Sequence, residues 1–178
     1  YFYAENNTAA FWTTIFVLVN TYNIIKILLE RRTKIIPDEI RDLYEGIFRT
    51  LTTSEFLYFW NMGTIKSAND EYLIRSGEHQ KNLLLVLSGS ADVEVNGKPI
   101  ANLTRGTFIA EISFLSGEPA SADVHANDEL FFVSWNSDRL KNLKDENPSF
   151  WMKLQHALSE DLIRKVKPQA KRDSQIED

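Results

Sequence analysis

Residues 64–135 contain a series of short apolar runs separated by glycine turns. This pattern constrains the possible folds of the chain more than any other feature of the sequence. The run NLLLVLSG ends at Gly89, and SADVEVNGK alternates apolar and polar residues before it reaches Asn96-Gly97. An Asn-Gly pair is a strong signal for a two-residue hairpin turn. The segment ADVHANDELFFVSW predicts two more strands around an Asn-Asp turn. Short strands spaced in this way predict an antiparallel β-roll or barrel.

Segments with helical periodicity lie on both sides of these runs. Residues 35–63 contain Pro37 followed by two acids, which is typical of a first helical turn. Thr53 is expected to cap a second helix, and Gly63 is expected to end it. In residues 147–166 one helical face carries Phe150, Trp151, Leu154, Leu158, Leu162 and Val166. Leu154, Leu158 and Leu162 either pack on the roll as a lid or form a dimer contact, and the sequence leaves both open.

The most apolar stretch is residues 8–29, which contain no acid. A membrane-spanning helix needs roughly 20 predominantly apolar residues, so the length predicts a span. The basic residues Arg31, Arg32 and Lys34 follow it, and positive charge marks the cytoplasmic side. We therefore expect the membrane as a partner and a membrane location with the C-terminal domain in the cytoplasm. The alternative is a soluble helix that packs on a partner or lies on a membrane surface.

Composition excludes several classes of function. The net charge of −5 argues against a nucleic-acid partner, which a basic surface would favour. The chain has no cysteine, and its three histidines, His79, His125 and His156, lie on different predicted elements without metal-ligand spacing. No nucleophile motif or phosphate-binding glycine loop of an NTPase is present. We expect neither an enzyme nor a bound cofactor.

These patterns predict an α+β chain: an antiparallel β-roll, similar to a jelly roll, flanked by helices and preceded by a transmembrane helix. The expected divisions are residues 1–32 for the span and its flanks, 33–63 for a helical linker, 64–167 for the roll with its C-terminal helix, and 168–178 for a disordered tail.

The order of these landmarks resembles the cyclic nucleotide-binding domain family. The resemblance runs from about residue 48 to residue 166 and is carried by LIRSGE, LLLVLSGSADVEVNGKPIANLTRGTFIAEISFLSGEPASADV and ENPSFWMKLQHALSEDL. It implies an eight-stranded β-roll that holds its ligand inside, against a short cassette helix, with the last helix as a lid. An apolar segment ending in LLERR, then a helical linker and such a domain, is also similar to Popeye-domain proteins and their bacterial membrane-anchored relatives.

The family's phosphate-binding cassette, carried over by this resemblance, falls on FIAEISFLSGEPASADV. The family's Gly-Glu pair lies at Ala110-Glu111, so Glu111 takes the place of the acid that binds the ribose hydroxyl. The family's Arg, small residue and Ala lie at Ala120, Ser121 and Ala122, so no clamping Arg is present. The predicted ligand-binding residues are Ile109, Ala110, Glu111, Ile112, Ala120, Ser121 and Ala122.

The absent Arg predicts weak or absent binding of cyclic AMP or cyclic GMP, because a charge-assisted hydrogen bond contributes about 1.5–3 kcal/mol, or roughly 10- to 150-fold in affinity. Asp123 is expected to place further negative charge near the ligand, whereas Arg105 or Arg75 is a candidate compensating cation. Two functions stay open: a membrane-anchored regulatory domain with a degenerate cassette, and a ligand-free module of the same fold. In the second, the roll assembles with a partner protein or as a homo-oligomer.

Overall fold

The computed structural model describes residues 2–30 and 35–173, with the exposure of side chains given for 10–26 and 35–163. The chain divides into two compact units, Tyr1–Ile35 and Ile36–Asp178. The predicted basic flank at Arg31, Arg32 and Lys34 lies outside the described residues, as does the end of the predicted tail, 174–178.

The first unit contains one helix, α1 (Phe2–Glu30), whose side chains from position 10 to position 26 are all exposed. Within residues 2–30 and 35–173, no helix combines the length and the apolar character that crossing a membrane requires. The predicted transmembrane helix is therefore wrong. The helix is long enough, but polar residues dilute its apolar content, among them Thr14 and Asn20, whose side chains donate to the backbone oxygens of Ala10 and Phe16. The membrane location depended on that span and stays a prediction.

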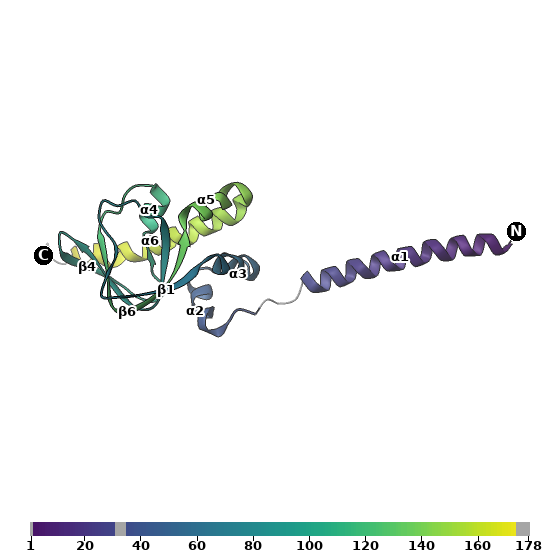
Figure 1. The fold of residues 1–178 in the computed structure, drawn as a ribbon, viewed down its shortest axis with the longest axis horizontal. Coiled ribbons are helices and arrows are strands. Elements are labelled where there is room, and N and C mark those ends of the chain that lie inside the picture. The colour runs from purple at the N-terminus through teal and green to yellow at the C-terminus, as the bar shows by residue number, and fades with distance from the viewer. Residues whose placement is uncertain (1, 31–34, 174–178) are drawn as a thin grey trace. The chain divides into compact units, whose positions relative to one another are not determined.

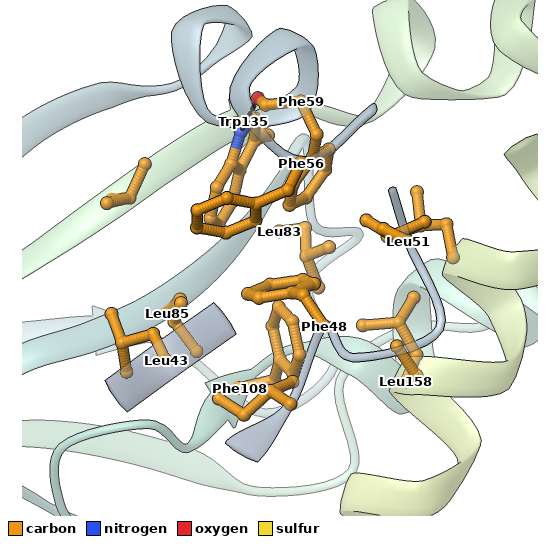
Figure 2. Close-up of a cluster of buried hydrophobic side chains, with 14 of the residues drawn as sticks. Leu43, Phe48, Leu51, Phe56, Phe59, Leu83, Leu85, Phe108, Trp135 and Leu158 are labelled. Atoms are coloured by element: carbon orange, nitrogen blue, oxygen red, sulfur yellow. Dashed lines mark hydrogen bonds between the residues drawn. The ribbon is translucent and has the colours of Figure 1, made fainter. Parts of the chain in front are cut away.

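The second unit begins with the linker helices α2 (Asp38–Gly46) and α3 (Thr53–Met62). Both pack into the core of this unit: Leu43 of α2 is 2% exposed, Phe56 and Phe59 of α3 are fully buried, and so is Phe48 in the connection between them. Figure 2 shows these rings against Leu83, Leu85 and Trp135 of the sheet. The linker is thus part of the same hydrophobic core as the roll.

The cap of α3 lies one residue earlier than predicted. Thr52, not Thr53, is the N-cap, and its side chain accepts from the backbone N–H of Glu55 at 3.3 Å. The Glu55 carboxylate accepts in turn from the backbone N–H of Thr52 at 2.7 Å, which completes a capping box. Gly63 ends the helix as predicted.

Six antiparallel strands form the roll (Figure 1): β1 (Thr64–Asn69), β2 (Tyr72–Ile74), β3 (Asn82–Val95), β4 (Lys98–Leu103), β5 (Phe108–Ile109) and β6 (Asp123–Asn136). The main order is β1-β6-β3-β4, with β2 paired to β6 and β5 paired to β3. The β-roll is confirmed. β3 and β6 are each 14 residues long and pair through bulges, so each spans two of the eight expected strand positions.

The predicted Asn-Asp turn does not divide β6, because the chain absorbs the positive φ of Asp128 as a bulge in one continuous strand. The Asn96-Gly97 hairpin is confirmed: both residues have positive φ, and Val95 pairs with Lys98 across the turn.

The continuous apolar run at the start of β3 has apolar neighbours on both faces. Leu83 and Leu85 face the helices, whereas Leu84 and Val86 face the interior of the roll. Beyond the bulges only one face is buried, which explains the switch to an alternating sequence. The interior cluster of the roll is made of Ala68, Ile74, Leu84, Val86, Ala91, Leu103, Ile109, Val124, Ala126, Leu130 and Phe132.

Three further helices complete the unit: α4 (Glu111–Ser116), α5 (Ser137–Glu146) and α6 (Pro148–Asp173). Figure 1 shows α6 running along the roll past α4. Leu154 and Leu158 are fully buried and Leu162 is half-buried, so the first two pack on this unit as a lid would. The helix continues to Asp173, into the segment predicted as a tail.

Candidate functional site

The cassette is held between a short strand and a long one. β5 pairs with the first part of β3 through Ile109–Leu84 and Phe108–Leu85, which places the start of the cassette in the middle of the unit. The chain then turns sharply at Ala110, forms α4, turns again at Gly117 and returns through residues 118–122 to β6. Ser113 closes the loop by donating from its Oγ to the backbone oxygen of Glu118.

Ala110 has a left-handed backbone, with φ 69° and ψ 14°. This conformation costs a residue with a Cβ roughly 1–2 kcal/mol, whereas glycine adopts it freely. The turn lets the Ala110 oxygen accept from the Phe114 N–H at 2.9 Å, and the side chain packs against the interior cluster. The resemblance places a glycine at this position, and the backbone has kept the shape that glycine favours.

Replacing Ala110 by glycine is expected to stabilise the protein by about 0.5–1 kcal/mol, because relief of the left-handed strain exceeds the extra entropy of an unfolded glycine. Urea denaturation of the two proteins measures the difference. Ala122→Gly is the matched control: Ala122 lacks a positive φ, so there the substitution should destabilise. Equal losses in both variants would contradict strain at Ala110.

The other predicted ligand-binding residues at the start of the cassette differ in their exposure to solvent. Ile109 is 1% exposed and Glu111 is 5% exposed, although Glu111 is an acid in the first turn of α4. Ile112 is 57% exposed and lies on the outer side of α4. A buried carboxylate at Glu111 agrees with the predicted place of a ribose acceptor, but that role stays a prediction.

The returning segment leaves little for a phosphate to bind at Ala120. The Ala120 backbone N–H donates to the Glu78 oxygen at 2.9 Å, and its oxygen accepts from the Gly77 N–H at 2.8 Å. Its side chain packs against the interior cluster of the roll. Ser121 is exposed and Ala122 is half-buried. At the position that the resemblance assigns to the family's clamping Arg, this chain therefore presents a methyl group and two occupied backbone groups.

Asp123 is bound to a neighbouring turn. Its Oδ1 accepts from the backbone N–H of Ser76 at 2.8 Å, which ties the start of β6 to the turn after β2. The Asp123 carboxylate therefore has a structural partner outside the cassette.

Arg105, one of the two predicted compensating cations, binds the linker. Its Nε lies 2.8 Å from Asp42 Oδ2, its Nη2 lies 2.8 Å from Asp42 Oδ1, and it also donates to the backbone oxygens of Leu87 and Glu39. The hydrogen bonds from Arg105 hold the pKa of the Asp42 carboxyl below its usual value. Arg105 therefore fastens α2 to the roll in a two-pronged ion pair.

The Asp42 pair predicts a pH dependence with a definite sign. A carboxyl whose folded pKa is lowered stabilises the fold above its unfolded pKa, and this contribution is lost as the pH falls through the folded value. The melting-temperature difference between the natural chain and Asp42→Asn should be constant above about pH 5 and shrink toward pH 3. Melting curves at pH 7, 5, 4 and 3 measure it, and a difference that is independent of pH would contradict the assignment.

Arg75, the second candidate cation, stacks on an aromatic ring. Its guanidinium carbon lies 3.3 Å from the ring centroid of Tyr72, whose hydroxyl donates to Glu94 at 3.2 Å. Tyr72 also meets the ring of His125 edge-on at 4.6 Å. Both candidate cations thus have partners away from the cassette. No group of three or more His, Asp or Glu residues in the described segments is arranged to hold a metal ion.

The C-terminal helix touches the cassette at two points that sequence reasoning missed. Trp151 of α6 meets Phe114 of α4 edge-on at 5.9 Å, and the buried Asp161 accepts from the backbone N–H of Phe108 at 3.2 Å. Asp161 is only 2% exposed. The sequence contains a pattern that indicates this buried acid, because Asp161 lies three residues after Leu158 on the same apolar face of the helix.

The comparisons with known proteins agree with this geometry. Residues 64–147 match the sequence model of the cyclic nucleotide-binding domain family. A solved cyclic nucleotide-binding domain from Methylobacillus flagellatus superposes with a TM-score of 0.65 at 23% identity, covering 75% of this chain and 83% of that one. This likeness shows the fold. The resemblance to the cyclic nucleotide-binding domain family is confirmed.

Two curated relatives define the resemblance further. Popeye domain-containing protein 1 of Gallus gallus is 24% identical over 166 residues, covering 87% of this chain and 46% of the relative. The cAMP-dependent protein kinase regulatory subunit of Emericella nidulans is 30% identical over 84 residues, or 46% of this chain and 20% of the relative. The resemblance to Popeye-domain proteins is confirmed, and the chain spans less than half the length of these relatives.

Proposed function

We propose that the second unit is a regulatory, non-catalytic domain that binds a cyclic nucleotide weakly, through a cassette without a phosphate clamp. The observation that carries the proposal is the environment of Ala120, whose methyl group packs on apolar side chains and whose backbone N–H and oxygen are both bonded. Arg75 and Arg105, the two candidate replacements, have other partners. A phosphate would therefore depend on Ser121 and on polar groups of the backbone.

The choice of ligand rests on the relatives. One curated relative is named as a cAMP-dependent regulatory subunit, and one structural neighbour was solved with a cyclic AMP analogue bound. The buried Glu111 supports a ribose, because a carboxylate oxygen can accept a hydrogen bond from a sugar hydroxyl. Cyclic AMP and cyclic GMP share this ribose and its cyclic phosphate, so both belong in the test.

Titration calorimetry on the full chain with cyclic AMP and cyclic GMP tests the proposal. A micromolar site that lacks one charge-assisted hydrogen bond should bind with a Kd from roughly ten micromolar to submillimolar. A Kd tighter than about one micromolar would show that the cassette is not deficient. Absence of heat at millimolar ligand would contradict nucleotide binding and leave the alternative.

The alternative is a ligand-free module that assembles with a partner protein or with itself. The packing of α6 favours it: Leu154 and Leu158 are fully buried against the core, and Asp161 is bonded to the backbone of Phe108 beside the cassette. Sedimentation of the full chain with and without nucleotide distinguishes the two functions, because only the first predicts a response to ligand.

A further inference from the structure

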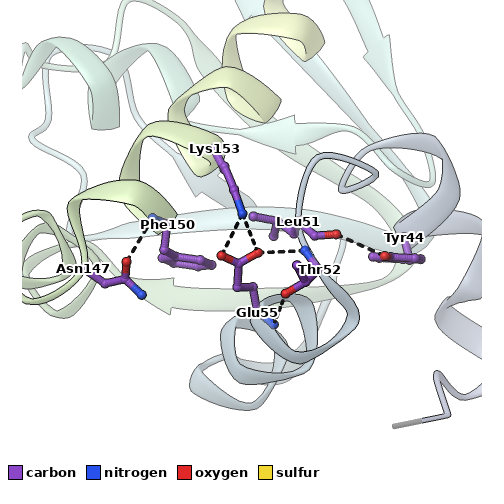
Figure 3. Close-up of polar contacts among 7 residues, drawn as sticks. All are labelled: Tyr44, Leu51, Thr52, Glu55, Asn147, Phe150 and Lys153. Atoms are coloured by element: carbon purple, nitrogen blue, oxygen red, sulfur yellow. Dashed lines mark hydrogen bonds and ion pairs between the residues drawn. The ribbon is translucent and has the colours of Figure 1, made fainter. Parts of the chain in front are cut away.

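One carboxylate oxygen joins the two ends of the second unit. Oε2 of Glu55 accepts from the backbone N–H of Thr52 at 2.7 Å and also from Nζ of Lys153 at 2.9 Å. Lys153 lies on α6, 98 residues farther along the chain, and reaches Oε1 of the same carboxylate at 2.9 Å. Figure 3 shows this carboxylate between the cap of α3 and the side of α6.

The double contact is partly shielded from water. The Glu55 side chain is 22% exposed and that of Lys153 is 33% exposed, so the pair is screened less than an ordinary surface pair. Burial by itself would raise the pKa of Glu55, but the hydrogen bonds from Lys153 and Thr52 outweigh it and lower the pKa. Glu55 is therefore ionised near neutral pH, the state in which both donors are satisfied.

The same helix holds the chain just before this cap. Glu160 of α6 pairs with Arg49 at 3.4 Å, and the adjacent Asp161 accepts from Phe108, two residues before the left-handed turn at Ala110. On the other side, the Tyr44 hydroxyl of α2 donates to the Leu51 oxygen at 3.0 Å. The connection between α2 and α3 is thus bonded to α6, and α6 is bonded in turn to β5 at the start of the cassette.

We propose that Glu55 couples the position of α6 to the N-terminal cap of α3. While Lys153 is in place, it fixes the Glu55 carboxylate in the orientation that closes the capping box. When α6 moves away, the carboxylate loses two of its bonds, and the Thr52 N–H loses a firmly held acceptor. A displacement of the C-terminal helix then weakens the N-terminal cap of α3. The coupling does not depend on what displaces the helix, so this inference is independent of nucleotide binding.

Amide hydrogen exchange in the full chain tests the coupling, with Lys153→Met as the variant, because methionine keeps an apolar stem and removes the ammonium group. The exchange of the Thr52 amide should become faster by a factor on the order of five, the change that corresponds to one helix cap. Lys153→Arg keeps the charge and should leave this exchange within about twofold of the natural chain.

Arg49→Gln is the matched control, because it breaks another ion pair between α6 and the same region without sharing an atom with Glu55. It should leave the Thr52 amide unchanged. In a Thr52→Ala, Lys153→Met double variant, the two losses of stability should be non-additive. The proposal is overturned if Lys153→Met speeds exchange in α6 alone, or if Arg49→Gln changes the Thr52 amide as much as Lys153→Met does.

Discussion

The Ala120→Arg variant is expected to bind cyclic AMP and cyclic GMP about 10- to 150-fold more tightly than the natural chain. The physical reason is that a guanidinium at this position would donate a charge-assisted hydrogen bond to the cyclic phosphate, worth about 1.5–3 kcal/mol. Because Ala120 packs against the interior cluster of the roll, the new side chain starts on the inner side of the cassette, where the ligand would lie. Titration calorimetry measures the change.

Ala120→Gln is the control for this experiment, because it adds a polar side chain without a charge. It should recover little of the affinity, and the gain in Ala120→Arg should weaken with added salt. A melting curve establishes that both variants remain folded. If Ala120→Arg folds and its affinity is unchanged, the missing clamp is not what limits binding, and the methyl group of Ala110 becomes the next candidate.

The Phe48→Ala variant is expected to lose about 3–5 kcal/mol of unfolding free energy, the range for removing a fully buried aromatic ring. Phe48 is fully buried, and its ring centroid lies 5.3 Å from Phe56, 5.4 Å from Phe59 and 5.8 Å from Phe108. It therefore joins the α2–α3 connection to the cassette strand (Figure 2). Urea denaturation followed by tryptophan fluorescence measures the loss, because Trp135 lies in the same core.

Met152→Ala is the matched control for the core, since Met152 is 64% exposed on α6. A change within about 0.5 kcal/mol is expected there. A loss below about 1 kcal/mol in Phe48→Ala would mean that the linker helices do not unfold with the roll. A large loss would establish that a change at the cassette and a change in the linker act on one cooperative unit.

The features predicted well from the sequence are those whose cause is local. The Asn96-Gly97 turn has its geometry set by two residues that tolerate positive φ, and the alternation of β3 after its bulges follows from one face of the strand being exposed. The transmembrane prediction was wrong because it relied on the length of the apolar segment, whereas the polar residues of α1 make that segment too polar to cross a membrane.

What the sequence alone determined is the β-roll with its flanking helices, whereas the place of the cassette within it stays a prediction. Only the tertiary structure decided which partners the charged side chains bind, since these partners lie far apart in the chain. Arg105 binds Asp42, Lys153 binds Glu55 and Asp161 binds the Phe108 backbone. The physical reason is that periodicity shows which face of an element is buried, whereas an ion pair depends on which faces meet. Which faces meet is decided only when the linker helices, the roll and α6 pack around one core.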